Sequence, residues 1–137
     1  CNRSSHNLSY YKSIYSLDRL TEIIGIMDIV IITIASTRET EHLIDGSIIS
    51  MMKEEALLVN VSRGNIIDEK ALVKALRKKS IAGAILDVFE EEPLNETNPL
   101  WSCDNVIITP HNSFVSDKNK KRINDIIVNN FIKWRER

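Results

Sequence analysis

Short apolar runs alternate with segments of helical periodicity along the chain. Four runs have the length of strands, at residues 28–34, 56–61, 81–88 and 105–109. Continuous apolar runs of this length are typical of strands that are buried on both faces of a parallel sheet. Strands that alternate with helices form right-handed βαβ units. The pattern therefore predicts an α/β fold built on a parallel sheet.

The segments between these runs predict helices. Before the first run, Ser16 is placed to cap a helix over residues 17–27. A second helical segment covers residues 40–53, and Asp68 is placed to cap a third helix that ends at Lys79. Each has an apolar face. These faces consist of Leu17, Leu20 and Ile24; of Leu43, Ile44, Ile48 and Met52; and of Leu72, Val73 and Leu76.

The last third of the chain departs from this alternation. Residues 90–104 contain Pro93 and Pro99 and little periodicity, which predicts a loop with one short turn. A helix follows at about residues 117–136. Its apolar positions are spaced by three and four, as in a helix that packs against a domain. They are Ile123, Ile126, Ile127, Phe131 and Trp134. We interpret them as a packing face.

Three of the predicted strands are followed by groups that can do chemistry. Arg63 follows the second, Asp87 and Glu92 lie at or after the end of the third, and His111 follows the fourth. In an open parallel sheet the strands end at one edge, and ligands bind outside that edge. A cation, two carboxylates and an imidazole are therefore expected to converge on one crevice.

Each of these groups has a plainer interpretation. His111 can act as a general acid–base or only hydrogen-bond its neighbours. Glu92 differs from Glu90 and Glu91, which we interpret as solvated, because Pro93 stiffens the chain after it. A carboxylate in that place can hold an imidazole tautomer.

Arg63 and Asp87 also have two interpretations. The guanidinium of Arg63 can bind an anionic substrate or form a surface ion pair with Asp68 or Glu69. Asp87 needs a partner because it lies in an apolar run, and a structural hydrogen bond can supply one. Gly64 suggests a turn with unusual backbone angles. The two remaining histidines, His6 and His42, have no evident carboxylate partner and are assigned no role.

The composition and net charge limit the classes of binding partner to be expected. The 137 residues suffice for one domain, and hydrophobic and charged residues make up 43% and 27%. The net charge of −1 gives no sign of a nucleic-acid or anionic membrane surface, and the basic positions between 118 and 122 are typical of a solvated helix start. No metal site is expected. Two cysteines indicate a reducing, cytoplasmic compartment. The first residue is Cys, so we expect a portion of a longer protein.

The order of the motifs carries a resemblance. The run NVSRGNIIDEKALVKALRKKSIAGAILDVFEEEPL, followed by NPLW and NVIITPH, resembles the D-isomer-specific 2-hydroxyacid dehydrogenases, among them glycerate and phosphoglycerate dehydrogenases and glyoxylate or hydroxypyruvate reductases. It extends back through MDIVIITIASTRETEHLID. The resemblance implies a Rossmann-like, doubly wound parallel sheet. Residues 1–137 would be part of a dinucleotide-binding domain, without its first βα unit and without the substrate domain.

The resemblance implies hydride transfer between NAD(P) and a small 2-hydroxy or 2-keto acid, by the complete protein only. His111 would exchange the proton, Glu92 would pair with it, and Arg63 would bind the substrate carboxylate. Asp87 would hold the nicotinamide carboxamide. Further cofactor contacts are implied for Val61 and Ser62, and on the other side for Ile34, Ala35 and Thr40. Family members usually form homodimers. Some members act as co-repressors, so the alternative is a non-catalytic NAD(P)-sensing or interaction protein.

Several positions depart from the family pattern. An acid that binds the ribose in NAD users is replaced at the corresponding place by Asn2, followed by Arg3 and Ser4, so NADP is expected in preference to NAD. The four glycines are Gly25, Gly46, Gly64 and Gly83, so the glycine-rich phosphate loop is absent from this sequence. Ala35 replaces a usual proline. Ser113 and Phe114 replace glycines after His111, which reshapes the expected substrate pocket.

Overall fold

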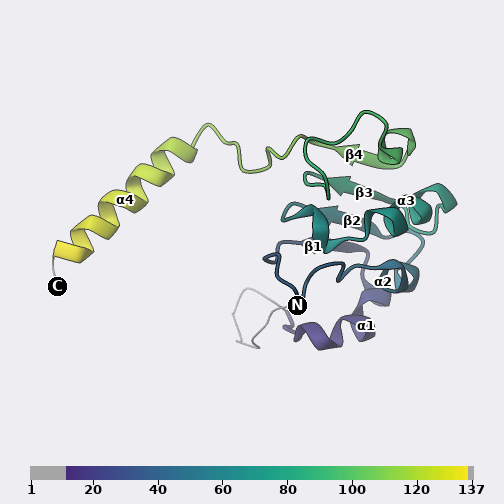
Figure 1. The fold of residues 1–137 in the computed structure, drawn as a ribbon. Helices are drawn as coiled ribbons and strands as arrows, with labels where there is room; N and C mark the ends of the chain where they lie inside the picture. The colour runs from purple at the N-terminus through teal and green to yellow at the C-terminus, as the bar shows by residue number, and fades with distance from the viewer. Residues whose placement is uncertain (1–11, 136–137) are drawn as a thin grey trace.

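A four-stranded parallel sheet forms the centre of the domain in the computed structural model, which describes residues 12–135. Its strands are β1 (Ile29–Ile32), β2 (Leu57–Asn60), β3 (Gly83–Leu86) and β4 (Val106–Ile108), and they lie side by side in chain order (Figure 1). Each strand falls within one of the four predicted runs. The predicted α/β fold with a parallel sheet is confirmed.

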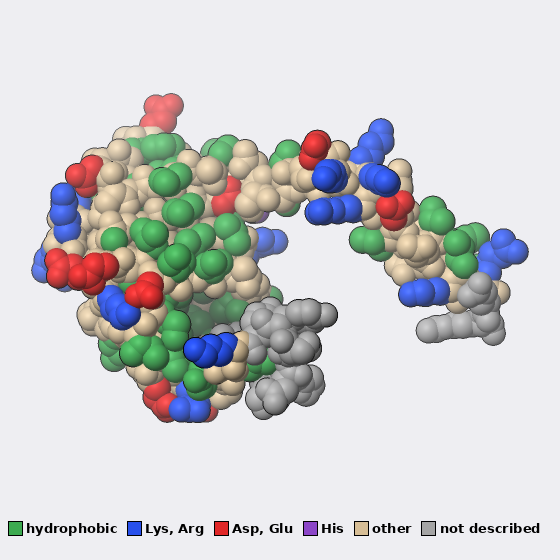
Figure 2. All heavy atoms as spheres, turned by 180° about the vertical axis from the view of Figure 1, so that it is seen from behind, with side chains coloured by type: hydrophobic (Ala, Val, Ile, Leu, Met, Phe, Trp, Pro, Cys, Tyr) green, Lys and Arg blue, Asp and Glu red, His purple; other side chains and the backbone are tan. Residues whose placement is uncertain are grey.

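Helices connect the successive parallel strands. Helix α2 (Gly46–Met51) connects β1 to β2, and α3 (Glu69–Lys78) connects β2 to β3. Because right-handed crossovers between strands in chain order place helices on one face, this sheet has a single helical layer in its described part. On the other face Ile31 and Ile107 are exposed. The view from behind shows hydrophobic side chains gathered over the body of the domain (Figure 2).

Helix α3 begins and ends as its sequence predicts. The side chain of Asp68 accepts a hydrogen bond from the N–H of Ala71 at 3.0 Å, which satisfies one of the free donors at the helix start. Leu72, Val73 and Leu76 are buried in the core. Lys79 ends the helix in the left-handed region, with φ 54°.

The two earlier helical predictions are only partly right. Residues 17–26 form consecutive short turns, of which only Leu20–Ile23 is α-helical (α1), and the hydroxyl of Ser16 contacts Asp18 instead of capping the backbone. The second helix begins at Gly46, six residues later than predicted. Asp45 caps it, since its carboxylate accepts from the N–H of Ile48 at 2.9 Å. Leu20, Ile24, Ile44, Ile48 and Met52 are buried as expected.

The segment after β3 and the last helix behave differently from each other. Residues 90–104 form a loop with one short 3-10 turn, Pro99–Ser102, as predicted. Helix α4 (Asn119–Arg135) also forms, but it lies apart from the sheet, and none of its residues is buried (Figure 1). The predicted packing of its apolar stripe is therefore wrong for the described residues, since Ile123, Ile126, Ile127, Phe131 and Trp134 are all exposed. No helix within residues 12–135 has the length and apolar character needed to cross a membrane.

The left-handed end of α3 generates a prediction. Replacing Lys79 by Gly removes the steric cost of a side chain at φ 54°. We expect the free energy of unfolding to rise by about 0.5–1 kcal/mol in urea titrations. The matched control is Lys78→Gly, one residue earlier and inside the helix, which should lower that free energy by a similar amount. Equal signs for the two variants would contradict the prediction.

Candidate active site

The residues that follow the strands meet at one edge of the sheet. Arg63 lies three residues after β2, Asp87 directly follows β3, and His111 lies three residues after β4. All strands are parallel, and β2, β3 and β4 are neighbours. Their carboxyl ends therefore bring these side chains to the edge where ligands bind in sheets of this kind.

His111 and Glu92 form a close polar pair at this edge. The Nδ1 atom of His111 lies 2.6 Å from Oε2 of Glu92, and the side chains are 40% and 34% exposed. The other carboxylate oxygen, Oε1, accepts from the N–H of Phe89 at 3.0 Å. The carboxylate is thus held from two sides, with the second imidazole nitrogen left for other contacts. Phe114 lies edge-on to the His111 ring, at 6.5 Å between centroids.

Arg63 acts on the same carboxylate through its charge. Burial raises the pKa of Glu92, but the hydrogen bonds from His111 and Phe89 and the charges of His111 and Arg63 outweigh it, so that the pKa lies below its usual value. Arg63 forms no ion pair with Asp68 or Glu69, both of which are described. The alternative role of Arg63 as their surface partner is therefore wrong.

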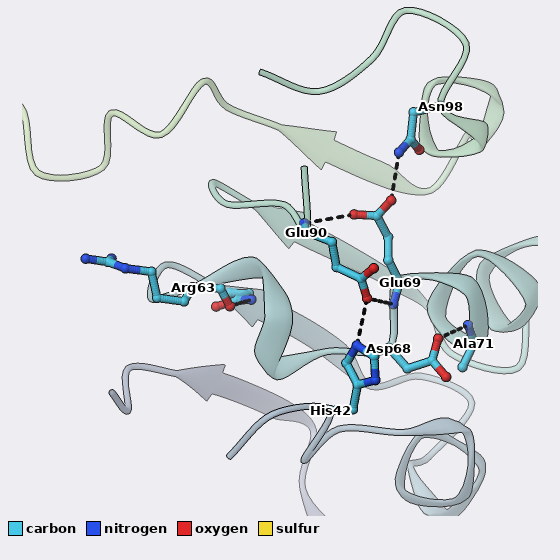
Figure 3. Close-up of polar contacts among 8 residues, drawn as sticks. His42, Arg63, Asp68, Glu69, Ala71, Glu90 and Asn98 are labelled. Atoms are coloured by element: carbon cyan, nitrogen blue, oxygen red, sulfur yellow. Dashed lines mark hydrogen bonds and ion pairs between the residues drawn. The ribbon is translucent and has the colours of Figure 1, made fainter. Parts of the chain in front are cut away.

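A buried asparagine shapes the turn that carries Arg63. Asn60, at the end of β2, donates from Nδ2 to the carbonyl of Arg63 at 2.9 Å. Its Oδ1 accepts from the N–H of Ser62 at 3.1 Å and from the hydroxyl of Ser62 at 3.2 Å. Asn60 is almost completely buried. The turn is therefore fixed by a side chain beneath it. The Arg63 side chain points away from the other labelled residues (Figure 3), and its Nη1 donates to the carbonyl of Ser62 at 2.6 Å.

Gly64 is required by close packing and not by unusual backbone angles. No glycine among the described residues has a positive φ, so the expected reason for Gly64 is wrong. A Cβ at this position would lie 1.8 Å from the carbonyl carbon of Phe89 and 2.4 Å from the nitrogen of Glu90. The Arg63 turn therefore packs directly against the backbone of the segment that carries Glu92.

Asp87 holds the turn that carries His111. Its Oδ1 accepts from the Thr109 hydroxyl at 2.5 Å and from the N–H of Asn112 at 3.0 Å, and its Oδ2 accepts from the N–H of Ser113 at 2.9 Å. Between these donors His111 adopts the left-handed conformation, with φ 50°. Burial raises the pKa of Asp87, but these donors lower it far more, to well below its usual range. The partner expected for a carboxylate in an apolar run is thus structural.

The other residues implied as cofactor contacts lie at the ends of β1 and β2. Thr40 is buried, and its hydroxyl donates to the carbonyl of Ala35 at 2.9 Å. Ser62 is buried against Asn60. Ala35 and Val61 are exposed, and Ile34 is half-buried. These residues fit a wall against which one half of a dinucleotide lies, because the accessible side chains are apolar and the polar ones hold the loops. Asn2, Arg3 and Ser4 lie outside the described residues.

A further polar cluster, which no sequence pattern predicted, lies beside this site. The expectation that His42 lacks a carboxylate partner is wrong. Glu90 is exposed, as expected of a solvated residue, but it also contacts His42. Nε2 of His42 lies 3.0 Å from Oε1 of Glu90. The same oxygen accepts from the N–H of Glu69 (Figure 3). The two residues are 48 positions apart, so no local pattern could have shown their contact.

Residues 1–113 match the family model for the NAD-binding domain of D-isomer-specific 2-hydroxyacid dehydrogenases. The chain belongs to this family. Among curated relatives, it is 38% identical over 120 residues to a (S)-sulfolactate dehydrogenase from Chromohalobacter salexigens, covering 88% of this chain and 39% of that protein. It is 44% identical over 105 residues to a glyoxylate reductase from Thermofilum pendens, covering 77% and 31%.

Solved structures of the family have the same fold. A family protein from Aeromonas salmonicida has a TM-score of 0.87 at 38% identity, over 98% of this chain and 43% of that one. A second, from Xanthobacter autotrophicus Py2 in complex with NADPH and MES, has a TM-score of 0.76 at 38% identity, over 80% and 35%. The chain thus spans about two fifths or less of the length of the relatives named here. The Rossmann-like interpretation is confirmed.

The close contact at Gly64 generates a prediction. Gly64→Ala forces the Arg63 turn away from Phe89 and Glu90, because backbone atoms cannot yield as a flexible side chain would. We expect a loss of about 3 kcal/mol in the free energy of unfolding, measured by urea denaturation. Gly46→Ala is the matched control, since its added Cβ would meet only the Ala71 side chain at 3.4 Å. A Gly64→Ala protein as stable as that control would contradict the prediction.

The engaged carboxylate of Asp87 generates a second prediction. Asp87→Asn removes the charge and points an N–H group at converging donors, so we expect a loss of about 2–3 kcal/mol in the free energy of unfolding at pH 7. The pKa of Asp87 is lower in the folded state than the ordinary 3.8. Its contribution is therefore present above pH 3.8 and declines as the pH falls toward the folded value.

Urea titrations between pH 7 and pH 3 test this dependence. The difference between the natural protein and Asp87→Asn should shrink below pH 3.8. Asp28→Asn is the control, since Asp28 is exposed and pairs with Lys53 at the surface. A difference that stays constant over the whole pH range would show that the charge of Asp87 does not stabilise the fold.

Proposed function

We propose that the protein transfers a hydride between NAD(P) and a small 2-hydroxy or 2-keto acid, and that this chain supplies the cofactor-side half of the site. The observation that carries the proposal is the His111–Glu92 pair at the carboxyl edge of the sheet, with the charge of Arg63 acting on the same carboxylate. Family membership supports the reaction class, because the relatives named above are dehydrogenases and reductases.

In this proposal His111 exchanges the proton at the substrate oxygen. The Glu92 carboxylate accepts from Nδ1, which fixes the ring orientation and leaves Nε2 to give a proton to a keto group or to take one from a hydroxyl. The pair is partly exposed, so a substrate can reach it from the sheet edge. When bound, NAD(P) supplies or accepts the hydride.

Arg63 binds the substrate carboxylate in the same proposal. A guanidinium is always charged and forks onto two oxygens, which positions an acid group more firmly than an ammonium does. The turn beneath it is fixed by Asn60 and by the close contact at Gly64. The cation is therefore carried by a rigid support. Its Nη1 donates to the Ser62 carbonyl at 2.6 Å, and the other guanidinium N–H groups are left for the ligand.

The residues proposed to contact the cofactor lie at or near the same edge of the sheet. Ile34, Ala35, Thr40, Val61 and Ser62 would line the dinucleotide, with Asp87 beneath the nicotinamide end. We propose NADP in preference to NAD, because Asn2, Arg3 and Ser4 offer a cation and polar groups where an acid would repel a 2′-phosphate. Two related structures are complexes with NADPH and with NADP, which supports binding of the phosphorylated dinucleotide within the family.

We further propose a cytoplasmic homodimer that uses neither nucleic acid nor membrane as a partner. The even balance of charge and the two cysteines support the compartment. The exposed apolar side chains of the sheet and of α4 support self-association, because contiguous apolar surface is typical of contact sites.

Oxidation of NADPH with glyoxylate or hydroxypyruvate by the full-length protein tests the function. His111→Ala should lower kcat by about 10³-fold, since a positioned general acid contributes that much, while the Kd for NADPH stays nearly unchanged. Activity that survives this substitution would remove His111 from its proposed role. Cofactor binding without turnover in the natural protein would instead favour the non-catalytic sensor. Better catalytic efficiency with NADH would overturn the NADP preference.

The carboxylate-binding role has its own variant in the same assay. Arg63→Ala should lower kcat/KM for the keto acid by about 10²-fold, through loss of a charged hydrogen-bonding partner, and leave the Kd for NADPH almost unaltered. Arg77→Ala is the control, because Arg77 lies on α3 and contacts Ser102 away from the sheet edge. A change confined to cofactor affinity would show that Arg63 does not bind the acid.

A further inference from the structure

The segment between β3 and η4 (Pro99–Ser102) carries three consecutive glutamates that differ sharply in their contacts. Glu92 pairs with His111, as described above. Glu91 is exposed and makes no hydrogen bond or ion pair with any residue in the 12–135 range. Glu90 forms contacts at both its side chain and its backbone. The three therefore have different surroundings despite identical chemistry.

The Glu90 carboxylate joins two distant parts of the chain. Its Oε1 atom accepts from the N–H of Glu69 at 3.1 Å and lies 3.0 Å from Nε2 of His42. Glu69 is the first residue of α3, where helix N–H groups have no partner within the helix. The helix start thus favours a carboxylate at this place, both as an acceptor and as a negative charge.

The side chain of Glu69 in turn contacts the segment after β3. Its Oε2 accepts from the backbone N–H of Glu90 at 3.3 Å, and its Oε1 accepts from Nδ2 of Asn98 at 2.7 Å. The segment after β3 is therefore fastened to α3 at two points, as the close-up shows (Figure 3). Between these points lies the portion that carries Glu92.

The His42 side of the cluster encloses the Arg63 turn. His42 donates its backbone N–H to the carbonyl of Asn65 at 2.8 Å, and Ile44 donates to the carbonyl of Ile66 at 3.0 Å. Gly64 packs against Phe89 and Glu90. The contact between the side chains of His42 and Glu90 closes this ring around the turn. Displacing Glu90 would therefore remove one support of the Arg63 turn and one support of the Glu92 segment together.

We propose that Glu90 is a positioning residue, whose carboxylate fastens the Glu92 segment to the start of α3 and to His42 and so sets the geometry of the His111–Glu92 pair. This deepens the proposed function and rests on it. The link to Glu92 is short, because the N–H of Phe89, directly before Glu90, donates to Oε1 of Glu92. A shift of Glu90 moves this donor away from the carboxylate.

The test is the titration of the Glu92 carboxyl carbon by NMR in the folded chain, without cofactor or substrate. With Glu90→Ala, the donors that favour the charged form of Glu92 are lost from their positions, so we expect Glu92 to bind its proton about tenfold more tightly. Glu90→Gln keeps an oxygen that can accept from Glu69 and His42, and should restore most of the natural value. Glu91→Ala is the matched control and should change nothing.

A purely structural role for Glu90 would give a different result. It would lower the free energy of unfolding and leave the titration of Glu92 in the folded state unaltered, which would overturn the proposal. An equal effect of Glu90→Ala and Glu91→Ala would also overturn it. If Glu90→Ala does not fold, His42→Ala decides, because it removes one contact at a half-exposed site. Glu92 should then bind its proton severalfold more tightly, and an unchanged titration would refute the role.

This experiment separates the two proposals. The titration reports the geometry of Glu92 whether or not the full-length protein turns over a keto acid. If the full-length protein is inactive but Glu92 responds to Glu90→Ala as expected, the proposed reaction is refuted and the positioning role is supported. Full activity with an unresponsive Glu92 would do the reverse.

Discussion

The geometry of the site depends on one buried carboxylate. Asp87 leaves the core at the end of β3, and three donors from the segment after β4 converge on it. A buried charge is tolerated only when its hydrogen-bonding capacity is filled. Asp87 therefore stabilises the fold and, through the same bonds, fixes the turn that presents His111. Stability and the placement of the imidazole cannot be varied independently at this position.

The remaining supports act between loops. Asn60 holds the Arg63 turn from below, Gly64 allows that turn to touch the segment after β3, and Glu90 ties the segment to α3. Asn60 and Gly64 lie at and after the end of β2, and Glu90 lies after the end of β3. The sheet brings them within reach, and side-chain to backbone hydrogen bonds then set their relative positions. The arrangement gives Arg63, Glu92 and His111 fixed positions near the ends of three neighbouring strands.

The sequence predicted the parts of the fold that depend on local pattern. The strands, the Asp68 cap and the core face of α3 follow from apolar periodicity and from one capping carboxylate. The start of α2 was missed because Asp45, within the predicted segment, caps the helix by accepting from the N–H of Ile48. The His42–Glu90 contact joins loops far apart in the chain, and the packing of Gly64 depends on a neighbouring backbone. Neither leaves a periodic signal. The exposed stripe of α4 shows that periodicity marks an apolar face without naming what covers it.

The left-handed backbone conformation at His111 determines how the imidazole could lose its orientation toward Glu92. A residue with a side chain holds φ 50° only where its surroundings compensate a cost of about 1 kcal/mol or more. The direction of the imidazole is thus imposed by the main chain, and rotation about the side-chain bonds alone could not restore it. Loss of the donors that grip Asp87 would let this residue relax to an ordinary conformation. The ring would then swing away from Glu92 although every reacting group was still present in the chain.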